Sequence, residues 1–477
     1  MKKLLLLFLL VYKSVLFAQT KLTSFPLDLK KTDENIQILN AENKQTHDVF
    51  VFASSSQNIT ILKYNSALFL TNQFTFPKTL NKLLIGYSFG EDGNPYLYWA
   101  SEDFKNIIAV KYSLENKSVK MLKFDFPLTP QFIVTSFQEN NEFYILSKYE
   151  DQQVLIVYAF KNGIVEKKEF DFSSFDFHNT NGQLMTFNKI VDENPIEKID
   201  TDDFTPLEKS TQKSKIYFKN NHLILTLDYN TKKTHVFDLD LENHAIKEKN
   251  YMQPLIDKSR NLSNSYLLDN KLYQINANKY VIVVEIKDYD SGQILKSVNT
   301  LKNDTINFKN SPLYLLSDNR KPVEIKKTSD FLNRLSFLNI GLSAFKNSQN
   351  TFITIGGSPK EEEYYISFGN VNLSQMYNAQ SVYFESVVNN KFEFIQQPQL
   401  PFAIDNIYYF LSLQKKAAFP NIFKFQDYYI LGYYDYTDKQ YIMRKFYDGL
   451  MPNENTNPII NKAVFSKPIP FGEIKRR

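Results

Sequence analysis

The chain has 477 residues, contains no cysteine, and carries 56 basic against 52 acidic residues. Without cysteine it can form no disulfide, no thiolate metal site and no thioether-linked lipid anchor. Its charges of both signs are interspersed along the whole chain, so the concentrated basic surface that nucleic-acid binding requires is not expected.

The first 18 residues have the order of a cleavable signal peptide. Two lysines are followed by an unbroken apolar run over residues 4–12, and Ala18 precedes the predicted cut. As a helix, the hydrophobic part would rise only about 22 Å, short of the roughly 30 Å needed to cross a bilayer. We therefore predict that residues 19–477 are exported, without a membrane span, to the periplasm or alternatively out of the cell.

From residue 19 onward the chain repeats one unit, which is a short apolar strand, a polar turn and a second apolar strand. The first three copies occupy residues 49–64, 96–112 and 143–160, and their closing aromatic residues lie 48 positions apart. Later copies begin near these residues: His222, Tyr280, Thr351 and Asp427. Seven such hairpins, rich in Val, Ile, Tyr and Phe, predict four-stranded sheets that cover one another's faces.

This layout resembles the β-propeller superfamily over nearly the whole of residues 19–477. The resemblance implies an all-β fold, with a single propeller of seven blades (within a range of six to eight) and one short helical insertion. Two or three separate β-sandwich domains are the alternative architecture. A propeller joins its two ends, so the strands expected at 22–29 and 463–466 should lie in the same blade or in neighbouring blades.

Two segments interrupt the repeat. Residues 192–214 contain two prolines and many charged side chains, a composition that predicts a charged surface loop inserted into the propeller. A second insertion lies at residues 325–345. Its apolar residues have helical spacing and predict a helix over 330–340, with Ser329 as the cap and Gly341 as the residue that stops it.

One short motif suggests serine chemistry. Residues 86–90 match the G-x-S-x-G pattern of serine hydrolases, with Ser88 at the centre. In those enzymes a turn from a strand into a helix exposes the serine. Residues 91–95 read as a turn with no helix after it, so we interpret Ser88 as part of a plain connection between strands.

A histidine-rich hairpin is the first candidate for a metal site. Three histidines and two alternating aspartates fall within it: His222, His235, His244, Asp238 and Asp240. Zinc needs three or four ligands that converge. Polar residues on a solvated strand face account for the same pattern, and we favour that interpretation.

A second candidate is the acidic group Asp200, Asp202 and Asp203. It lacks the glycine and the distal glutamate of a calcium loop, so we interpret it as part of the charged loop. The sequence therefore predicts no catalytic residue, no metal site, no cofactor-binding residue and no cofactor.

Two classes of function remain. The favoured one is a non-enzymatic, exported protein-interaction module. Its general layout is similar to that of periplasmic subunits that attach to outer-membrane protein-export machines, including plug-type subunits of the type nine secretion translocon. That resemblance implies an envelope or outer-membrane protein complex as partner, with no nucleic acid, no direct membrane span and no lipid anchor. The alternative is a glycan- or peptide-binding protein, or a hydrolase, with carboxylates from separate blades at the propeller mouth.

Overall fold

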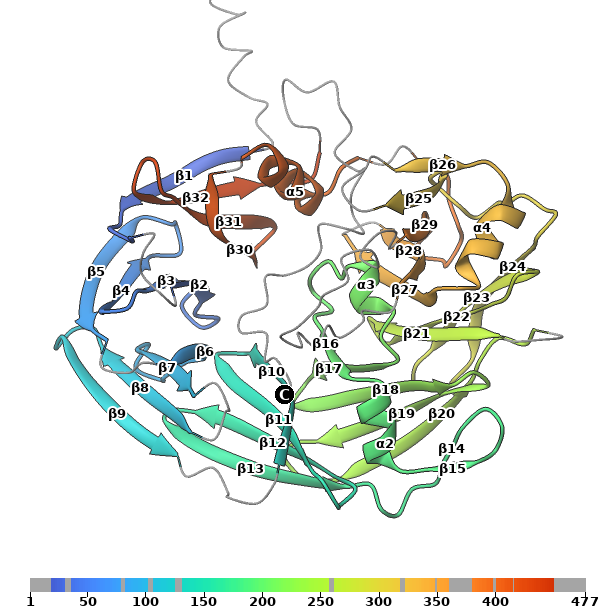
Figure 1. Cartoon of the computed structure of the whole chain (residues 1–477), viewed down its shortest axis with the longest axis horizontal. Coiled ribbons are helices and arrows are strands. Elements are labelled where there is room, and N and C mark those ends of the chain that lie inside the picture. The colour runs from blue at the N-terminus through green and yellow to red at the C-terminus, as the bar shows by residue number, and fades with distance from the viewer. Residues whose placement is uncertain are drawn as a thin grey trace, which may run out of the picture.

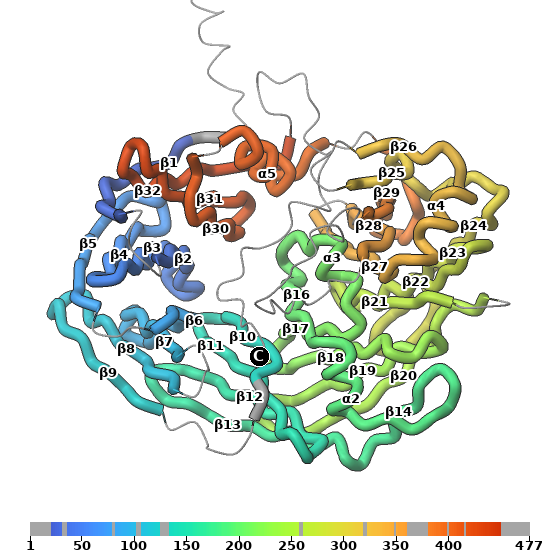
Figure 2. Tube along the Cα trace, viewed as in Figure 1, coloured from blue at the N-terminus to red at the C-terminus, as the bar shows by residue number. Residues whose placement is uncertain are grey.

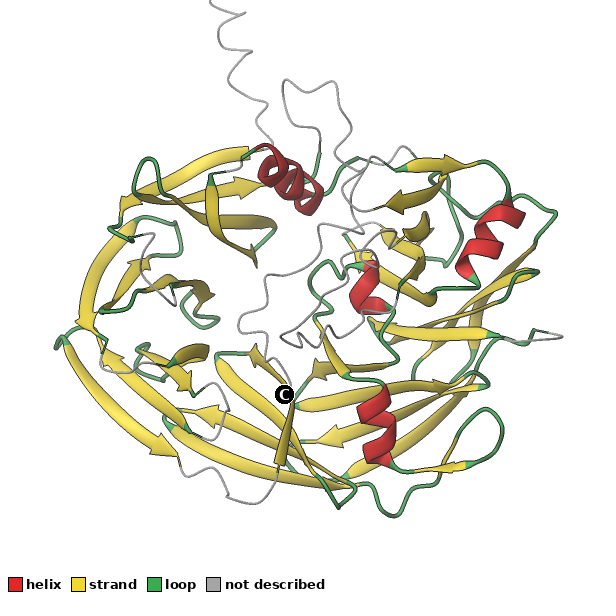
Figure 3. Ribbon diagram, in the orientation of Figure 1, coloured by secondary structure: helices red, strands yellow, loops and turns green. Residues whose placement is uncertain are grey.

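The computed structural model describes residues 19–30, 36–78, 82–101, 106–124, 131–256, 261–317, 322–347, 350–359, 380–397, 400–414 and 416–449. The expected signal peptide (residues 1–18) and the strand expected at 463–466 lie outside these ranges. Within them the chain is nearly all β, and its helices are few and short (Figure 3). None of the helices in the described ranges has the length and apolar character that a membrane span requires.

Seven sheets of four or five strands account for most of the described residues. Sheet 1 consists of β2 (Gln37–Glu42), β3 (Val49–Ser54), β4 (Asn58–Tyr64) and β5 (Leu70–Pro77). Sheet 2 consists of β6 (Leu83–Phe89), β7 (Pro95–Ala100), β8 (Ile107–Ser113) and β9 (Ser118–Phe124). Sheet 3 consists of β10 (Gln131–Glu139), β11 (Glu142–Tyr149), β12 (Val154–Lys161) and β13 (Ile164–Asp171). Sheet 4 consists of β16 (Ile196–Ile199), β17 (Ser214–Lys219), β18 (His222–Asn230), β19 (Lys233–Asp240) and β20 (Ile246–Met252). Sheet 5 consists of β21 (Leu262–Leu268), β22 (Lys271–Ala277), β23 (Val281–Asp288) and β24 (Ile294–Leu301).

The last two sheets do not follow chain order. Sheet 6 has the order β26 (Val323–Ile325), β25 (Leu313–Ser317), β29 (Gln380–Asn389), β28 (Asn350–Ser358) and β27 (Asn339–Lys346). Sheet 7 has the order β1 (Gln19–Pro26), β32 (Gln440–Phe446), β31 (Tyr428–Asp435) and β30 (Ala417–Phe425). Outside the seven sheets lie α2 (Phe187–Glu193), α3 (Leu207–Ser210), α4 (Thr328–Leu335), α5 (Ala403–Leu413), and the pair β14 (Phe177–His178) and β15 (Leu184–Met185).

The seven sheets stand around a common centre in a propeller-like arrangement (Figure 1). Every residue of the middle strands β3, β7 and β31 is buried, because each of these sheets has neighbours on both faces. The strands at the rim, such as β5 and β9, expose most of their residues. This contrast explains why the sequence shows apolar hairpins separated by polar strands.

Apolar side chains fill the spaces between neighbouring sheets. Sheets 7 and 1 share a cluster that includes Val51, Tyr64 and Ile430, and α5 contributes Ile407 to the cluster between sheets 6 and 7. Fully burying one large apolar side chain contributes about 1.5–3 kcal/mol. The all-β prediction is therefore confirmed, and the packing has the form that mutual coverage of the sheets requires.

The N-terminal strand belongs to the sheet that is otherwise built from the C-terminal part of the chain. β1 pairs antiparallel with β32, and the register runs from Gln19 opposite Phe446 to Pro26 opposite Gln440. Figure 2 shows blue β1 alongside red β32. The predicted N-terminal strand therefore exists and pairs with β32.

The charged segment 192–214 is not the exposed loop that its composition predicts. It contains β16 and α3, and it buries Ile196, Ile199 and Leu207. β16 pairs in parallel with β17, so this segment adds a strand to the inner edge of sheet 4. The prediction failed because many of its charged side chains bind one another or backbone oxygens within the fold.

The predicted helix in the second insertion is present but shorter than expected. α4 begins at Thr328 and ends at Leu335, and the chain is already in strand β27 at Asn339. Lys327 occupies the cap position without a side-chain cap bond, and Ser329 lies inside the helix. The glycine expected to stop the helix, Gly341, lies instead within β27, where it permits a close approach described below.

Candidate functional site

Residues 196–211, which we call the central insertion, connect several sheets near the centre of the molecule (Figure 1). Lys198 reaches sheet 3, and the Tyr429 hydroxyl of sheet 7 donates a hydrogen bond to Asp203. The Tyr266 hydroxyl of sheet 5 donates to Thr205 Oγ1 at 2.8 Å, and Thr211 Oγ1 shares a hydrogen bond of 3.1 Å with a serine of sheet 6. The insertion therefore positions side chains against elements that are far apart in sequence.

Two carboxyl groups meet at one lysine on this insertion. Lys198 Nζ lies 3.2 Å from Glu139 Oε2, at the end of β10, and 2.5 Å from Asp200 Oδ1. The two carboxyl oxygens are therefore no more than about 6 Å apart. The Glu139 side chain is 27% exposed and that of Asp200 is 62% exposed. We call Glu139, Lys198 and Asp200 the central carboxylate site.

The environments of these three groups differ. Burial raises the pKa of the Glu139 carboxyl, and the charges of Asp200 and Asp202 raise it further, although Lys198 opposes them. Burial alone would lower the pKa of Lys198, but Asp200 and Glu139 outweigh that effect and hold it above the ordinary lysine value. The site thus pairs a carboxyl group whose pKa is raised with a second, solvent-exposed acid.

Tyrosines and a further acid surround the central carboxylate site. Burial raises the pKa of Tyr87 on β6, and the charges of Glu42, Glu139 and Asp200 raise it further. Burial also raises the pKa of Asp203, which accepts the hydrogen bond from Tyr429. Side chains from sheets 1, 2, 3 and 7 therefore act on the same region, and they supply acid groups together with aromatic hydroxyl donors.

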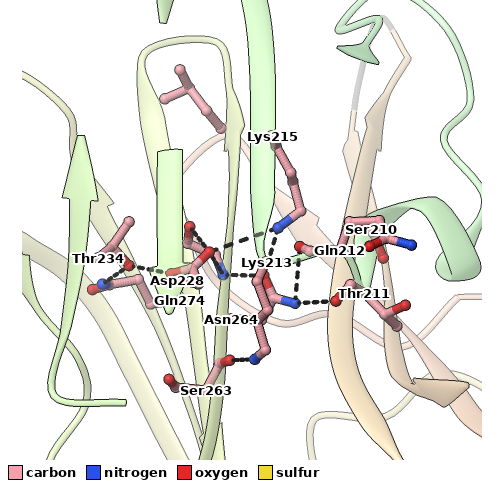
Figure 4. A network of polar contacts seen from close by, with 12 residues as sticks. Ser210, Thr211, Gln212, Lys213, Lys215, Asp228, Thr234, Ser263, Asn264 and Gln274 are labelled. Carbon is pink, nitrogen blue, oxygen red and sulfur yellow. Dashed lines mark hydrogen bonds and ion pairs between the residues drawn. The ribbon is translucent and has the colours of Figure 1, made fainter. Parts of the chain in front are cut away.

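A second polar cluster lies between sheets 4 and 5, and Figure 4 shows it. Lys215 Nζ donates to Asn264 Oδ1 at 2.5 Å and lies 3.7 Å from Asp228 Oδ2. Asn264 Nδ2 donates in turn to the carbonyl oxygens of Thr211, at 3.0 Å, and Ile340, at 2.7 Å. We call the residues around Lys215 and Asp228 the lysine network. It ties the central insertion to sheets 4, 5 and 6.

Asp228 is the acceptor at the middle of the lysine network. Asp228 Oδ1 accepts hydrogen bonds from the Thr234 hydroxyl at 2.7 Å and from the Gln253 amide at 3.1 Å. Asp228 Oδ2 accepts from the hydroxyl of Ser265 at 2.7 Å and from its backbone nitrogen at 3.0 Å. The Lys215 and Asp228 side chains are fully buried. Burial lowers the pKa of Lys215 and of Lys213 to about 8 each, although the charge of Asp228 opposes this. The interior of this network is closed to a substrate, so its role is to hold the insertion.

The serine motif has no catalytic geometry. Ser88 lies within strand β6, not in a connection between strands, and it is fully buried. Its hydroxyl shares a hydrogen bond of 2.8 Å with the Tyr98 hydroxyl of the neighbouring strand. The interpretation of Ser88 as part of a turn was therefore wrong, because the strand continues to Phe89.

The histidines of the predicted metal candidate do not converge. His222 pairs with Asp238 at 2.6 Å, whereas His235 pairs with Glu248 at 2.5 Å. His244 lies in a turn with a positive φ of 57°. Among the described residues, no group of three or more side chains of the metal-binding types is placed to hold an ion.

The structure brings the acidic group Asp200, Asp202 and Asp203 close to the centre of the molecule, but the three residues make different contacts. Asp200 joins the central carboxylate site, the Asp202 carbonyl oxygen accepts from Lys424 at 2.6 Å, and Asp203 binds Tyr429. Glu139 was missed by the sequence analysis. The only local signal is its position at the end of an inner strand, just before the turn at Asn140.

No family model and no curated protein matches this chain. Among solved structures it is similar to cobalt-substituted Synechocystis ACO, with 11% identity, 56% of this chain and 61% of that chain covered, and a TM-score of 0.27. It is also similar to an ACO/RPE65 chimera and to a mutant of Synechocystis apocarotenoid oxygenase, each with 11% identity, 57% and 63% coverage, and a TM-score of 0.28. The chain spans about three fifths of the length of these structures.

These matches correct the functional prediction. The matched structures include oxygenases, which are enzymes, and this contradicts the prediction of a non-enzymatic interaction module. That prediction is withdrawn. TM-scores this low carry no argument about an activity, substrate or cofactor of this chain, so the function must be argued from its own residues.

Proposed function

We propose that the chain forms a single closed propeller of seven blades and that it is an enzyme with its active site at the central carboxylate site. The seven sheets, the apolar clusters between neighbouring sheets and the pairing of β1 with β32 support the closed ring. The observation that carries the enzymatic assignment is the meeting of Glu139 and Asp200 at Lys198.

The reaction that this pair supports best is hydrolysis of a glycosidic bond. Retaining glycosidases place two carboxyl groups about 5–5.5 Å apart, and the arrangement here limits Glu139 and Asp200 to about 6 Å. Two carboxyl groups in different environments can divide the roles of acid and nucleophile. The raised pKa of Glu139 suits a general acid, whereas exposed Asp200, next to a lysine, suits the nucleophile.

The steps follow from these positions. Glu139 gives its proton to the leaving oxygen while an Asp200 oxygen bonds to the anomeric carbon and the glycosidic bond breaks. Water then attacks the same carbon, gives a proton to Glu139 and releases the sugar from Asp200. Lys198 holds the Asp200 carboxylate in place through their ion pair. The hydroxyls of nearby tyrosines such as Tyr87 can bind a polyhydroxylated substrate.

The test is hydrolysis of a panel of aryl glycosides and polysaccharides by residues 19–477. Glu139→Gln and Asp200→Asn should each reduce the rate about 100- to 10,000-fold on the substrates that are cleaved. Glu197→Gln is the matched control, because Glu197 lies on β16, directly before Lys198, but pairs with Lys209 at 2.7 Å. Its rate should stay within about twofold of the wild type. Absence of hydrolysis across the panel, or full activity of Glu139→Gln, would refute the assignment.

We also propose that residues 1–18 direct export and are then removed. The support is the order of the two lysines, the apolar run and Ala18 in the sequence.

A further inference from the structure

One end of sheet 5 exposes large apolar side chains. Leu301, the last residue of β24, is 56% exposed and pairs with Val281 at the start of β23. Tyr280, in the turn that precedes β23, is 42% exposed, and its carbonyl oxygen accepts a hydrogen bond of 2.8 Å from the Lys302 backbone nitrogen. Leu301 and Tyr280 therefore lie side by side where the β22–β23 hairpin turns.

The loop that leads from β20 to β21 reaches the same end of sheet 5. Asn276 Nδ2 donates to the Pro254 carbonyl oxygen at 2.7 Å. Asn278, in the hairpin turn, donates through its Nδ2 to Asn261 Oδ1 at 3.1 Å. Between these two attachments lies Leu255, which is 90% exposed, more than any other large apolar side chain of the described residues. Exposed apolar side chains that gather in one place mark an interaction surface.

Positive charges accompany these apolar side chains. The Nζ atoms of Lys279 and Lys302 each lie 5.0 Å from the centre of the Tyr280 ring, one from each neighbouring segment. Both lysines are exposed, and neither forms an ion pair with another described residue. Lys232 is also exposed, and its carbonyl oxygen binds the backbone of the β20–β21 loop. Asp304, in the turn after β24, opposes only one of these three charges.

We propose that this surface docks on a lipid bilayer that carries anionic headgroups. We call it the sheet 5 tip and define it by Leu255, Lys279, Tyr280, Leu301 and Lys302. The two leucines enter the boundary between headgroups and acyl chains, the tyrosine lies at the level of the headgroups, and the two lysines meet lipid phosphates. The inference is independent of the proposed hydrolase activity.

The charges favour a bilayer over a second copy of the chain as the occupant. In a two-fold dimer the same surface faces itself, so Lys279 and Lys302 would approach their own copies. Like charges that meet in an interface are unfavourable. An anionic bilayer supplies the opposite charge instead, and its fluid surface receives a side chain as protruding as Leu255 without a matching pocket.

The experiment sediments residues 19–477 with vesicles of phosphatidylglycerol and phosphatidylcholine, or of phosphatidylcholine alone. Binding to the anionic vesicles should be at least about tenfold stronger than binding to the neutral ones, and it should weaken as salt is raised. Leu255→Asp combined with Leu301→Asp should reduce binding at least about tenfold, because it removes both apolar contacts and adds two negative charges. Lys279→Gln combined with Lys302→Gln keeps the leucines and should also reduce binding about tenfold.

Ile294→Asp is the matched control. Ile294 is 51% exposed and begins the strand that Leu301 ends, which places it about 23 Å from the sheet 5 tip, beyond a Debye length. This variant should bind within about twofold of the wild type. The thermal midpoint of each variant, measured in parallel, shows that the fold is kept.

Three outcomes would overturn the proposal. One is absence of binding to the anionic vesicles, or equal binding to the neutral ones. Another is unchanged binding of the double aspartate variant, which would place the contact elsewhere on the chain. The third is a dimer in sedimentation equilibrium that the double aspartate variant dissociates, because it would assign the sheet 5 tip to a second copy of the chain.

Discussion

The lysine network makes the stability of this protein depend on alkaline pH in a direction that can be worked out. Lys213 and Lys215 have pKa values of about 8 in the folded chain because of burial, whereas a lysine in an unfolded chain titrates near 10.4. Above pH 8 the unfolded state therefore binds more protons than the folded state. The contribution of these two lysines to the free energy of unfolding should rise with pH in this window, because stability increases wherever the unfolded state holds the additional protons.

The magnitude follows from the same pKa values. One lysine of this kind contributes a slope approaching 1.4 kcal/mol per pH unit between its folded and unfolded pKa values. From pH 8 to 9.5 the gain is roughly 1.5 kcal/mol for fully buried Lys215, with a smaller gain for half-buried Lys213. Tyrosines with raised pKa values, such as Tyr229 at about 12, oppose this gain once the unfolded tyrosines begin to ionise, above about pH 9, so the lysine contribution is measured relative to a variant that lacks the amine.

Urea unfolding at constant ionic strength, at pH 7, 8, 9 and 9.5, measures this gain. Lys215→Met should lose the larger part of the pH dependence, because it removes the fully buried amine while Asp228 keeps its four hydrogen-bond donors. Lys219→Met is a control on the same strand that should leave the slope unchanged. Between pH 8 and 9.5 the wild type should gain about 1.5 kcal/mol of unfolding free energy relative to Lys215→Met, and no gain relative to that variant would refute the reasoning.

Three further predictions concern the fold and the export signal. Gly341→Ala should lower the free energy of unfolding by about 1–3 kcal/mol in urea, because a Cβ there would lie 2.9 Å from the backbone of Thr211. Unchanged stability would contradict this reasoning and show that the central insertion can move away from the added methyl group. Deletion of residues 19–26 should lower the thermal midpoint, because it uncovers the edge of β32, and an unchanged midpoint would contradict closure by β1. Sequencing of the native protein should start at Gln19, and a retained Met1 would contradict export.

The sequence predicted those parts of the fold in which local pattern and tertiary environment agree. The first hairpin, over residues 49–64, appears as β3 and β4, because alternating contacts with both neighbouring sheets need apolar side chains on both faces. The N-terminal strand was predicted over residues 22–29, and β1 occupies Gln19–Pro26. Its partner β32 could not be predicted, since pairing across the whole chain leaves no local signal.

The central insertion was misread because composition does not report pairing. Lys198 and Glu197 look like solvated charges in the sequence, but in the fold they bind Glu139 and Lys209 respectively. Such pairs let a charged segment pack near the centre of the molecule. The central carboxylate site could not be seen in the sequence for a related reason, because the other three strands of sheet 3 and α2 separate Glu139 from Asp200 along the chain, and the two meet only through the parallel pairing of β16.

The proposed hydrolysis is tested most directly by trapping its intermediate. The enzyme would be incubated with a 2-fluoro glycosyl fluoride of the sugar that it cleaves, and the labelled peptide identified by mass spectrometry. The account predicts one added sugar on Asp200, absent in Asp200→Asn and present in Glu197→Gln. A sugar attached to another residue, or hydrolysis without any trapped sugar, would contradict the role of Asp200 as nucleophile.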